Sequence, residues 1–294
     1  MNFINSDAEL RLYIPNAFST IEGEPTLFDK LLPWIRQAGE LITGRLTGEA
    51  VSRALLAESQ HRHEVAVAAR LTAHLALCEA IPALDLVLTD RGFGVVSTDT
   101  VAPASADRVA RLIRSHREAA DRTATTLLTM LEASDSLRSL WLDSEAGEYW
   151  TTTLVSTPLA ARELLLPEET PPVQLLDWHA ALRKETDPLE SVMADRWFGE
   201  ELMDAIRGRR DPEGFGRFSP MRRRIHRRML SILGALRAGK RDRAVMMADA
   251  LVETIRQAPP ALFPEWRRSP AALLFDPTDD MIFKNQKNDG GYWL

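Results

Sequence analysis

The spacing of apolar residues constrains the fold of this chain more than any other feature of its sequence. Apolar side chains recur at steps of three and four residues, which places them on one face of an α-helix. One such run covers residues 26–46, and we predict a helix there with a kink at Pro33. The best-defined run covers residues 105–131, where Ser105 is the predicted cap. Its apolar positions are Val109, Leu112, Ile113, Ala120, Thr123, Leu127 and Leu131.

Other segments extend this helical pattern along the chain. Ser6 and the acidic residues after it predict a short helix over 7–13, because a hydroxyl accepts first-turn amide hydrogens and acids suit the positive helix end. Residues 63–81 are apolar on nearly every side, which is typical of a helix surrounded by protein. Further helices are predicted over 175–183, 189–207, 221–237 and 241–257. The expected fold class is mainly α.

A short β-hairpin is expected between the helices of the first half. Residues 86–89 and 93–97 have the composition of strands and flank the tripeptide Asp90-Arg91-Gly92. Gly92 can adopt the left-handed backbone conformation that a three-residue hairpin loop requires. We therefore predict that the two segments pair around Gly92.

The chain is long enough for two lobes, and residues 168–173 are the predicted boundary. Their sequence is EETPPV, and two prolines in a polar stretch cannot continue a helix. We expect two helical bundles, residues 1–167 with the hairpin and residues 174–294 with a C-terminal arm. That arm has a possible hairpin of its own. The halves share an order of elements, so a diverged duplication is one interpretation, and a chance similarity of common helix pairs is the other.

Composition argues against several classes of protein. The chain is 45% hydrophobic and 27% charged, as in globular proteins. No apolar run approaches the roughly 20 residues that cross a bilayer, and the N-terminus lacks the regions of a signal peptide. The single cysteine, Cys78, fits a reducing cytosol, and the net charge of -6 gives no general attraction to nucleic acids or acidic membranes. We expect synthesis in the cytoplasm and no membrane partner.

No catalytic or metal motif is recognisable. The densest cluster of metal-binding residue types is His61, His63, His74 and Cys78, but only His74 and Cys78 are close enough on a helix to share an ion. Two ligands would be missing, so we expect both side chains to be buried in a helical core, and His116 to be a hydrogen-bonded core residue. The sequence contains no nucleophile elbow, HExxH or Walker lysine. We expect neither a cofactor nor an enzymatic activity.

One segment is strongly basic. Residues 207–243 contain thirteen Arg and Lys against three acidic residues, about +10 in a chain of net charge -6. Three explanations are open: docking on an acidic face of a neighbouring subunit, a solvated helix face, or contact with DNA phosphates. The run RRRIHRR has no interleaved aromatic residues, so specific nucleic-acid binding is not expected. The candidate interaction residues are Arg222, Arg223, Arg224, Arg227 and Arg228.

Two stretches carry a resemblance to a known family. IPNAFSTIEGEPTLFDKLLPWI and ALCEAIPALDLVLTDRGFGVVSTDTVAPASADRVARLI resemble a poorly characterised family of proteins from phages and prophages of Bacteroidetes. The resemblance covers residues 3–131 and extends to the tail GGYWL. It implies a structural virion protein of the neck, similar to head-tail adaptor and head-completion proteins. No catalytic residues are carried over.

The resemblance also implies partners. A subunit of this kind forms a ring, of twelve copies in such particles, beneath the portal protein and above tail or neck proteins. The hairpin and the C-terminal arm are the segments expected to reach those partners. The corresponding residues are Leu88, Arg91 and Phe93 in the hairpin and Tyr292, Trp293 and Leu294 in the arm. Two other classes stay open: a cytosolic nucleic-acid-binding or regulatory protein, and an enzyme whose site is assembled from dispersed residues.

Overall fold

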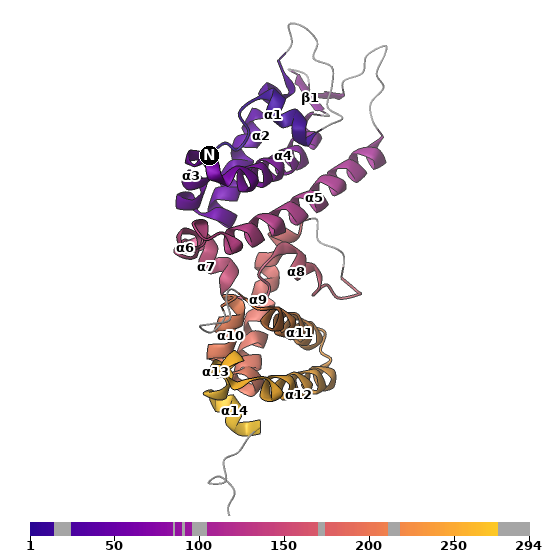
Figure 1. The fold of residues 1–294 in the computed structure, drawn as a ribbon. Helices are drawn as coiled ribbons and strands as arrows, with labels where there is room; N and C mark the ends of the chain where they lie inside the picture. The colour runs from indigo at the N-terminus through magenta and orange to yellow at the C-terminus, as the bar shows by residue number, and fades with distance from the viewer. Residues whose placement is uncertain are drawn as a thin grey trace, which may run out of the picture. The chain divides into compact units, whose positions relative to one another are not determined.

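The computed structural model describes residues 1–14, 25–84, 105–169, 174–210 and 218–275, together with the backbone of two short strands. The chain divides into two compact units, Met1–Arg183 and Lys184–Leu294. The predicted mainly α fold class is confirmed (Figure 1). The division between the units falls inside α9 (Leu175–Met193), whereas the sequence analysis placed the lobe boundary at 168–173.

Unit 1 is a bundle organised around two long helices. Its helices are α1 (Asp7–Tyr13), α2 (Leu27–Ile42), α3 (Glu49–Ala57), α4 (Arg62–Leu84), α5 (Ala106–Ala133), α6 (Leu137–Leu142), α7 (Glu145–Thr151) and α8 (Pro158–Arg162), followed by the first half of α9. The predicted cap of α1 is confirmed, because the Ser6 hydroxyl accepts a hydrogen bond from the Glu9 amide. Ser105 precedes α5 as predicted, but its carbonyl rather than its side chain accepts first-turn bonds.

Helix α4 is the core of unit 1. It packs between α2 and α5 (Figure 1). Side chains around its circumference, such as Leu71, Ala73 and Leu75, are buried. Within the described residues, Ser59–Leu84 is the one helical segment long and apolar enough to cross a membrane. The expectation that no segment approaches that length is therefore wrong. More than half of its most apolar stretch is buried against other helices, as in the core helix of a folded bundle.

The hairpin between α4 and α5 is present, with a different register from the one predicted. Strand β1 (Leu86–Thr89) pairs antiparallel with β2 (Gly92–Val95). Thr89 lies opposite Gly92 and Leu88 opposite Phe93, so the loop has two residues instead of three. Gly92 starts the second strand rather than closing the turn. The predicted strand also extended to residue 97, which lies outside the described residues.

Within its described residues, unit 2 contains the end of α9 and five further α-helices. These are α10 (Glu200–Arg207), α11 (Pro220–Arg237), α12 (Arg241–Gln257), α13 (Pro264–Arg267) and α14 (Pro270–Phe275). The predicted continuous helix over 189–207 is wrong. A π-helical turn, Ala194–Phe198, and Gly199 at φ +75 interrupt it. A non-glycine residue would be strained in the backbone conformation of Gly199. The predicted C-terminal hairpin lies outside the described residues.

The same interruption occurs in unit 1. There α2 continues into the π-helical turn Thr43–Thr47, which ends at Gly48 with φ +78 before α3 begins. At each site the glycine amide bonds back five residues along the turn, to the carbonyl of Thr43 or Ala194. A Cβ on Gly48 would lie 2.7 Å from the Cβ of Ser144, and a Cβ on Gly199 would lie 2.4 Å from that of Ser269. Glycine is therefore required at both positions for two reasons: the positive φ angle and the lack of space for a Cβ atom.

A tryptophan completes each junction. Trp141 donates its indole N–H to the carbonyl of Leu46 at 2.8 Å, and Trp266 donates to the carbonyl of Trp197 at 2.9 Å. These carbonyls belong to the ends of the π-helical turns, where the helix supplies no donor. Three residues after each tryptophan, a serine caps the next short helix. We call this arrangement of π-helical turn, glycine, tryptophan and serine the Trp junction.

The Trp junction favours the duplication interpretation over chance similarity. In unit 1 it joins α2 and α3 to α6 and α7, and in unit 2 it joins α9 and α10 to α13 and α14. Two long helices, α4 and α5 or α11 and α12, lie between the parts in both units. Among the residues that the structure describes, a hairpin joins the two long helices of unit 1 and not those of unit 2. In unit 2 the corresponding connection is three residues, 238–240.

Candidate protein interface

The basic segment folds mainly as the amphipathic helix α11. The Ser219 hydroxyl accepts a hydrogen bond from the Arg222 amide, and Pro220 occupies the first turn, where its missing N–H costs nothing. The inner side of the helix carries the buried side chains of Ile225, Met229 and Leu233. The predicted helices over 221–237 and 241–257 are thus confirmed to within one residue.

Arg222 belongs to the interior and not to the surface. Its side chain is 0% exposed and makes two bonds to the Glu265 carboxylate, at 2.9 and 2.7 Å. It also donates to the carbonyls of Leu262 and Arg210. The interpretation of Arg222 as an interaction residue therefore conflicts with its burial. This guanidinium ties α11 to the segment before α13 within unit 2.

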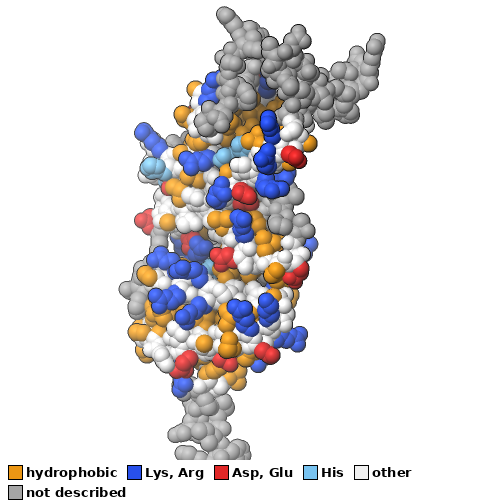
Figure 2. All heavy atoms as spheres, turned by 90° about the vertical axis from the view of Figure 1, so that its right-hand side faces the viewer, with side chains coloured by type: hydrophobic (Ala, Val, Ile, Leu, Met, Phe, Trp, Pro, Cys, Tyr) orange, Lys and Arg blue, Asp and Glu red, His pale blue; other side chains and the backbone are white. Residues whose placement is uncertain are grey.

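The other four candidates form an exposed basic row. Arg223, Arg224, Arg227 and Arg228 are all exposed, and no ion pair described for the chain includes them. Arg228 donates to the hydroxyl of Thr254 on α12. Figure 2 shows arginine and lysine side chains gathered on the face over α11 and α12. We refer to these four residues as the arginine row.

The arginine row does not help α11 to fold. Residues three and four apart lie on the same side of a helix, so Arg224 repels both Arg227 and Arg228, at about 0.2–0.5 kcal/mol for each pair. Arg223 also lies in the first turn, where the helix dipole disfavours positive charge and no acidic residue is present. These repulsions make the row unfavourable for the isolated helix α11.

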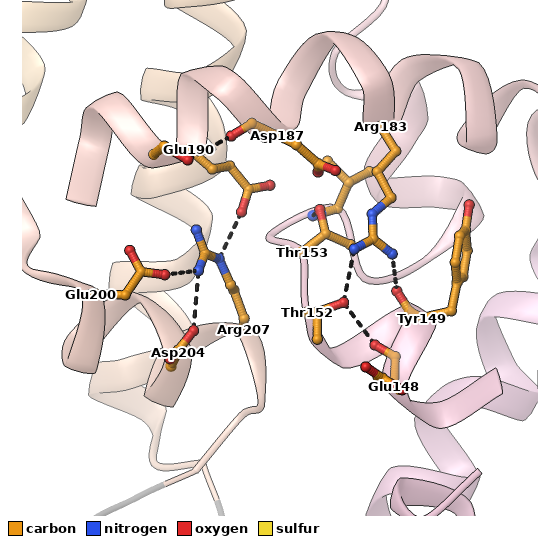
Figure 3. A network of polar contacts seen from close by, with 12 residues as sticks. Glu148, Tyr149, Thr152, Thr153, Arg183, Asp187, Glu190, Glu200, Asp204 and Arg207 are labelled. Atoms are coloured by element: carbon orange, nitrogen blue, oxygen red, sulfur yellow. Dashed lines mark hydrogen bonds and ion pairs between the residues drawn. The ribbon is translucent and has the colours of Figure 1, made fainter. Parts of the chain in front are cut away.

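Other arginines of the basic segment have structural partners. The buried Arg207 bonds to Glu190 at 2.8 Å, to Glu200 at 2.6 Å and to Asp204 at 3.1 Å (Figure 3). Burial acts to lower its pKa, but the carboxylates outweigh this and raise the pKa of Arg207 above its ordinary value. Arg237 pairs with Glu185 at 2.9 Å. Burial and partners thus separate these structural arginines from the exposed row.

The two units differ in charge. Unit 1 has 16 Lys and Arg against 25 Asp and Glu, a net charge of -9, and unit 2 has 20 against 17, a net charge of +3. The acidic residues of unit 1 include Asp143, Glu145 and Glu148, which are exposed around the junction of α6 and α7. No ion pair described for the chain includes these three. We call them the acidic corner, which the sequence analysis missed because their positions on one corner depend on the turn between two short helices.

The histidine cluster is a packed helix contact. Cys78 is buried as predicted, whereas His74 is only partly buried. His74 lies on α4 with its Nδ1 3.0 Å from the Nδ1 of His116 on α5. Burial and the neighbouring His116 lower the pKa of His74 to about 4, and burial also lowers the pKa of His116. Within the part of the chain that the structure describes, no three His, Cys, Asp or Glu side chains are placed to hold a metal.

A second buried histidine was not singled out from the sequence. His179 is 0% exposed, and its ring nitrogens contact the hydroxyl of Tyr149 and the carbonyl of Val155. Burial lowers the pKa of His179 to about 4. Arg183 lies one turn further along α9 and donates to the carbonyl of Tyr149 and the hydroxyl of Thr152 (Figure 3). These contacts make the first half of α9 part of unit 1.

The remaining predicted interaction residues belong to the hairpin and to the C-terminal arm. Leu88 and Phe93 are paired in the backbone of the hairpin, and nothing further is described of their side chains. Arg91 lies outside the described residues. So do Tyr292, Trp293 and Leu294 of the C-terminal arm. Their roles stay predictions.

Comparison with known proteins gives one family. Residues 22–149 match the family of unknown function DUF6712. This match begins before α2 and ends in α7, just after Ser144, so it contains the whole Trp junction of unit 1. The DUF6712 match covers less than half of the chain and none of unit 2. No curated protein and no solved structure matches the chain.

Proposed function

We propose that this chain is a structural virion protein, a head-tail adaptor subunit that forms an oligomeric ring in the neck of a tailed phage or phage-like particle. The observation that carries the proposal is the exposed arginine row on a packed helix, for which the described residues show no ion pair. A surface charge that weakens its own unit is best explained by a partner. The resemblance of residues 3–131 to phage and prophage proteins supports the assignment to a phage particle. The DUF6712 family has no known function, so the match to it supports no particular assignment.

The construction of the units also suits an assembly subunit. Each Trp junction fixes the end of a long helix by a buried indole hydrogen bond, which gives a rigid block. A ring needs rigid blocks with defined faces, because each interface is repeated around the symmetry axis. The connection between the two long helices contains a hairpin in unit 1, whereas three residues are enough in unit 2. We assign this hairpin to contact with the portal or the tail.

Electron microscopy tests this proposal directly. Purified full-length chain is imaged in negative stain, alone and after mixing with particles from cells in which its gene is deleted. We expect rings with a central opening, and new density at the neck of the complemented particles. A chain that binds no particle and leaves the defective particles unchanged would contradict the proposal.

The exposed arginine row also favours a second function, binding of nucleic acid through phosphates. Lys and Arg contacts to phosphate release counterions, so such binding weakens steeply with salt and is independent of sequence. Gel shifts with unrelated DNA duplexes at physiological salt measure this. Binding that survives at that salt and selects one sequence would support a regulatory DNA-binding protein instead of an adaptor.

A further inference from the structure

The arginine row needs an occupant with negative charges at helical spacing. Arg224 and Arg227 lie three residues apart on α11, and Arg224 and Arg228 lie four apart. Side chains at these steps are about 5–6 Å apart at their Cβ atoms. A partner that presents two carboxylates one helical turn apart matches this spacing. Regular phosphates on nucleic acid are the competing chemistry.

The acidic corner of this same chain has the required spacing. Glu145 and Glu148 lie three residues apart in α7, with Asp143 just before the helix. All three side chains are exposed, and no described ion pair includes them. Glu145 and Glu148 repel each other as the row's arginines do, whereas the positive end of α7 stabilises both of them in its first turn.

The Trp junction of unit 2 forms without the acidic residues of the corner. Trp141 and Ser144 of unit 1 correspond to Trp266 and Ser269 of unit 2, with the same hydrogen bonds. Between and after these residues, unit 1 has Asp143, Glu145 and Glu148, whereas unit 2 has Arg268, Pro270 and Leu273. The turn therefore forms with three acidic residues at these positions, or with one arginine and two uncharged residues.

We infer that the arginine row of one copy of this chain docks on the acidic corner of unit 1 of the next copy. The interface is heterologous, because the two surfaces are different patches of the chain. Heterologous contacts repeat from copy to copy, and they close into a ring when the rotation allows it. The charges of -9 on unit 1 and +3 on unit 2 favour this encounter over contact between like units.

This inference rests on the proposed function and names the contact by which its ring forms. The test uses two full-length variants with the charges neutralised. The row variant carries Arg223→Ala, Arg224→Ala, Arg227→Ala and Arg228→Ala. The corner variant carries Asp143→Asn, Glu145→Gln and Glu148→Gln. A matched control removes four exposed arginines of unit 1, with Arg36→Ala, Arg53→Ala, Arg62→Ala and Arg70→Ala, so its net charge equals that of the row variant.

Sedimentation velocity measures self-association of each protein at low salt and at about 0.5 M salt, where the Debye length is a few ångströms. We expect the native chain and the control to associate at low salt and to dissociate as salt rises. Each neutralised variant alone should associate about tenfold more weakly or worse, because one side of every interface is lost. An equimolar mixture of the two variants retains one native row and one native corner, and should form dimers that grow no further.

Three results would overturn the inference. One is a native chain that stays monomeric at low salt, and another is a row variant that associates as strongly as the control. The third is an unchanged association of the row variant together with loss of salt-dependent binding to a DNA duplex, which would assign the row to phosphates. Thermal unfolding of the variants serves to exclude misfolding, because removing repelling arginines should leave the melting temperature equal or higher. Incorporation of each variant into particles reports on the proposed function separately, since an adaptor could use other surfaces.

Discussion

At the scale of single residues, burial decides what each charged side chain of α11 does. Arg222 and Arg223 are neighbours in one helical turn, yet one is 0% exposed with a bidentate carboxylate partner and the other is exposed. The run RRRIHRR predicted a basic helix but could not separate these roles. The separation depends on Glu265, which is 43 residues away and reaches α11 only through the packing of unit 2.

Replacing Arg222 by Leu tests this division. The Glu265 carboxylate, 17% exposed, would lose its cation, and two backbone carbonyls would lose a donor. Breaking a buried pair from one side costs about 3–5 kcal/mol, so we expect a loss of that size in the free energy of unfolding. Arg223→Leu is the control and should change it by no more than about 0.5 kcal/mol. Urea unfolding followed by circular dichroism compares the two, and equal effects would contradict the assignment.

The burial of His74 beside His116 predicts a pH dependence of stability. The pKa of His74 is lowered to about 4 in the folded chain from 6.5, so between these values the unfolded chain binds more protons. Stability from this group is complete above pH 6.5 and is lost as the pH falls towards 4, by about 1–2 kcal/mol after allowance for its partial exposure. Asp121 acts in the opposite sense, because burial raises its pKa to about 6.

The variant His74→Gln isolates the histidine contribution. It should lose less stability than the native chain between pH 7 and pH 5, measured by urea unfolding at each pH. His63→Gln, at an exposed position on the same helix, is the control and should follow the native curve. A native chain and a His74→Gln variant with parallel pH profiles would show that burial does not lower the pKa of His74.

At the scale of elements, the helices could be predicted from the sequence and the π-helical turns could not. Apolar spacing located α4, α5, α11 and α12 within a few residues, because those helices bury one stripe or more against neighbours. A π-helical turn adds one residue to a single turn of a helix. Its cause lies elsewhere in the chain, in a tryptophan that arrives from about 70 to 95 residues away to bond the turn's carbonyl.

Gly48→Ala tests the Trp junction of unit 1. Alanine at φ +78 is strained, and its Cβ would lie 2.7 Å from the Cβ of Ser144. We expect a loss of about 2–4 kcal/mol in the free energy of unfolding, the sum of backbone strain and overpacking. Gly44→Ala is a matched control within the π-helical turn, where nothing lies within 4 Å of the new Cβ, and it should be neutral or stabilising. A similar effect of the two substitutions would show that the junction is not tightly packed.

At the scale of the whole molecule, the sequence predicted two lobes, and the structure divides the chain at a different place. The prolines of 168–173 mark the linker in the sequence, but unit 1 extends to Arg183. The reason is tertiary: the Asp121 carboxylate on α5 accepts hydrogen bonds from the amides of Leu175 and Leu176, and so holds the start of α9. Such a cap from a distant helix has no local signal. For the same reason, the sequence around residues 143–148 could not by itself predict that Asp143, Glu145 and Glu148 lie together on one surface.

Two fragments decide where unit 1 ends. Fragment 1–183 keeps the first half of α9, whereas fragment 1–167 removes it. Its loss removes the buried Leu176 side chain from the core of unit 1. It also removes His179, the hydrogen-bond partner of the Tyr149 hydroxyl and the Val155 carbonyl, and leaves Asp121 buried without its two donors. Burial of one leucine contributes about 1.5–3 kcal/mol and each buried hydrogen bond about 1 kcal/mol, so fragment 1–167 should be less stable by about 3–5 kcal/mol. Fragment 1–167 extended by a Gly/Ser segment of the missing length controls for chain length and should stay at the lower stability. Urea midpoints that coincide for all three fragments would return the boundary to residues 168–173 and would make α9 an element of unit 2 alone.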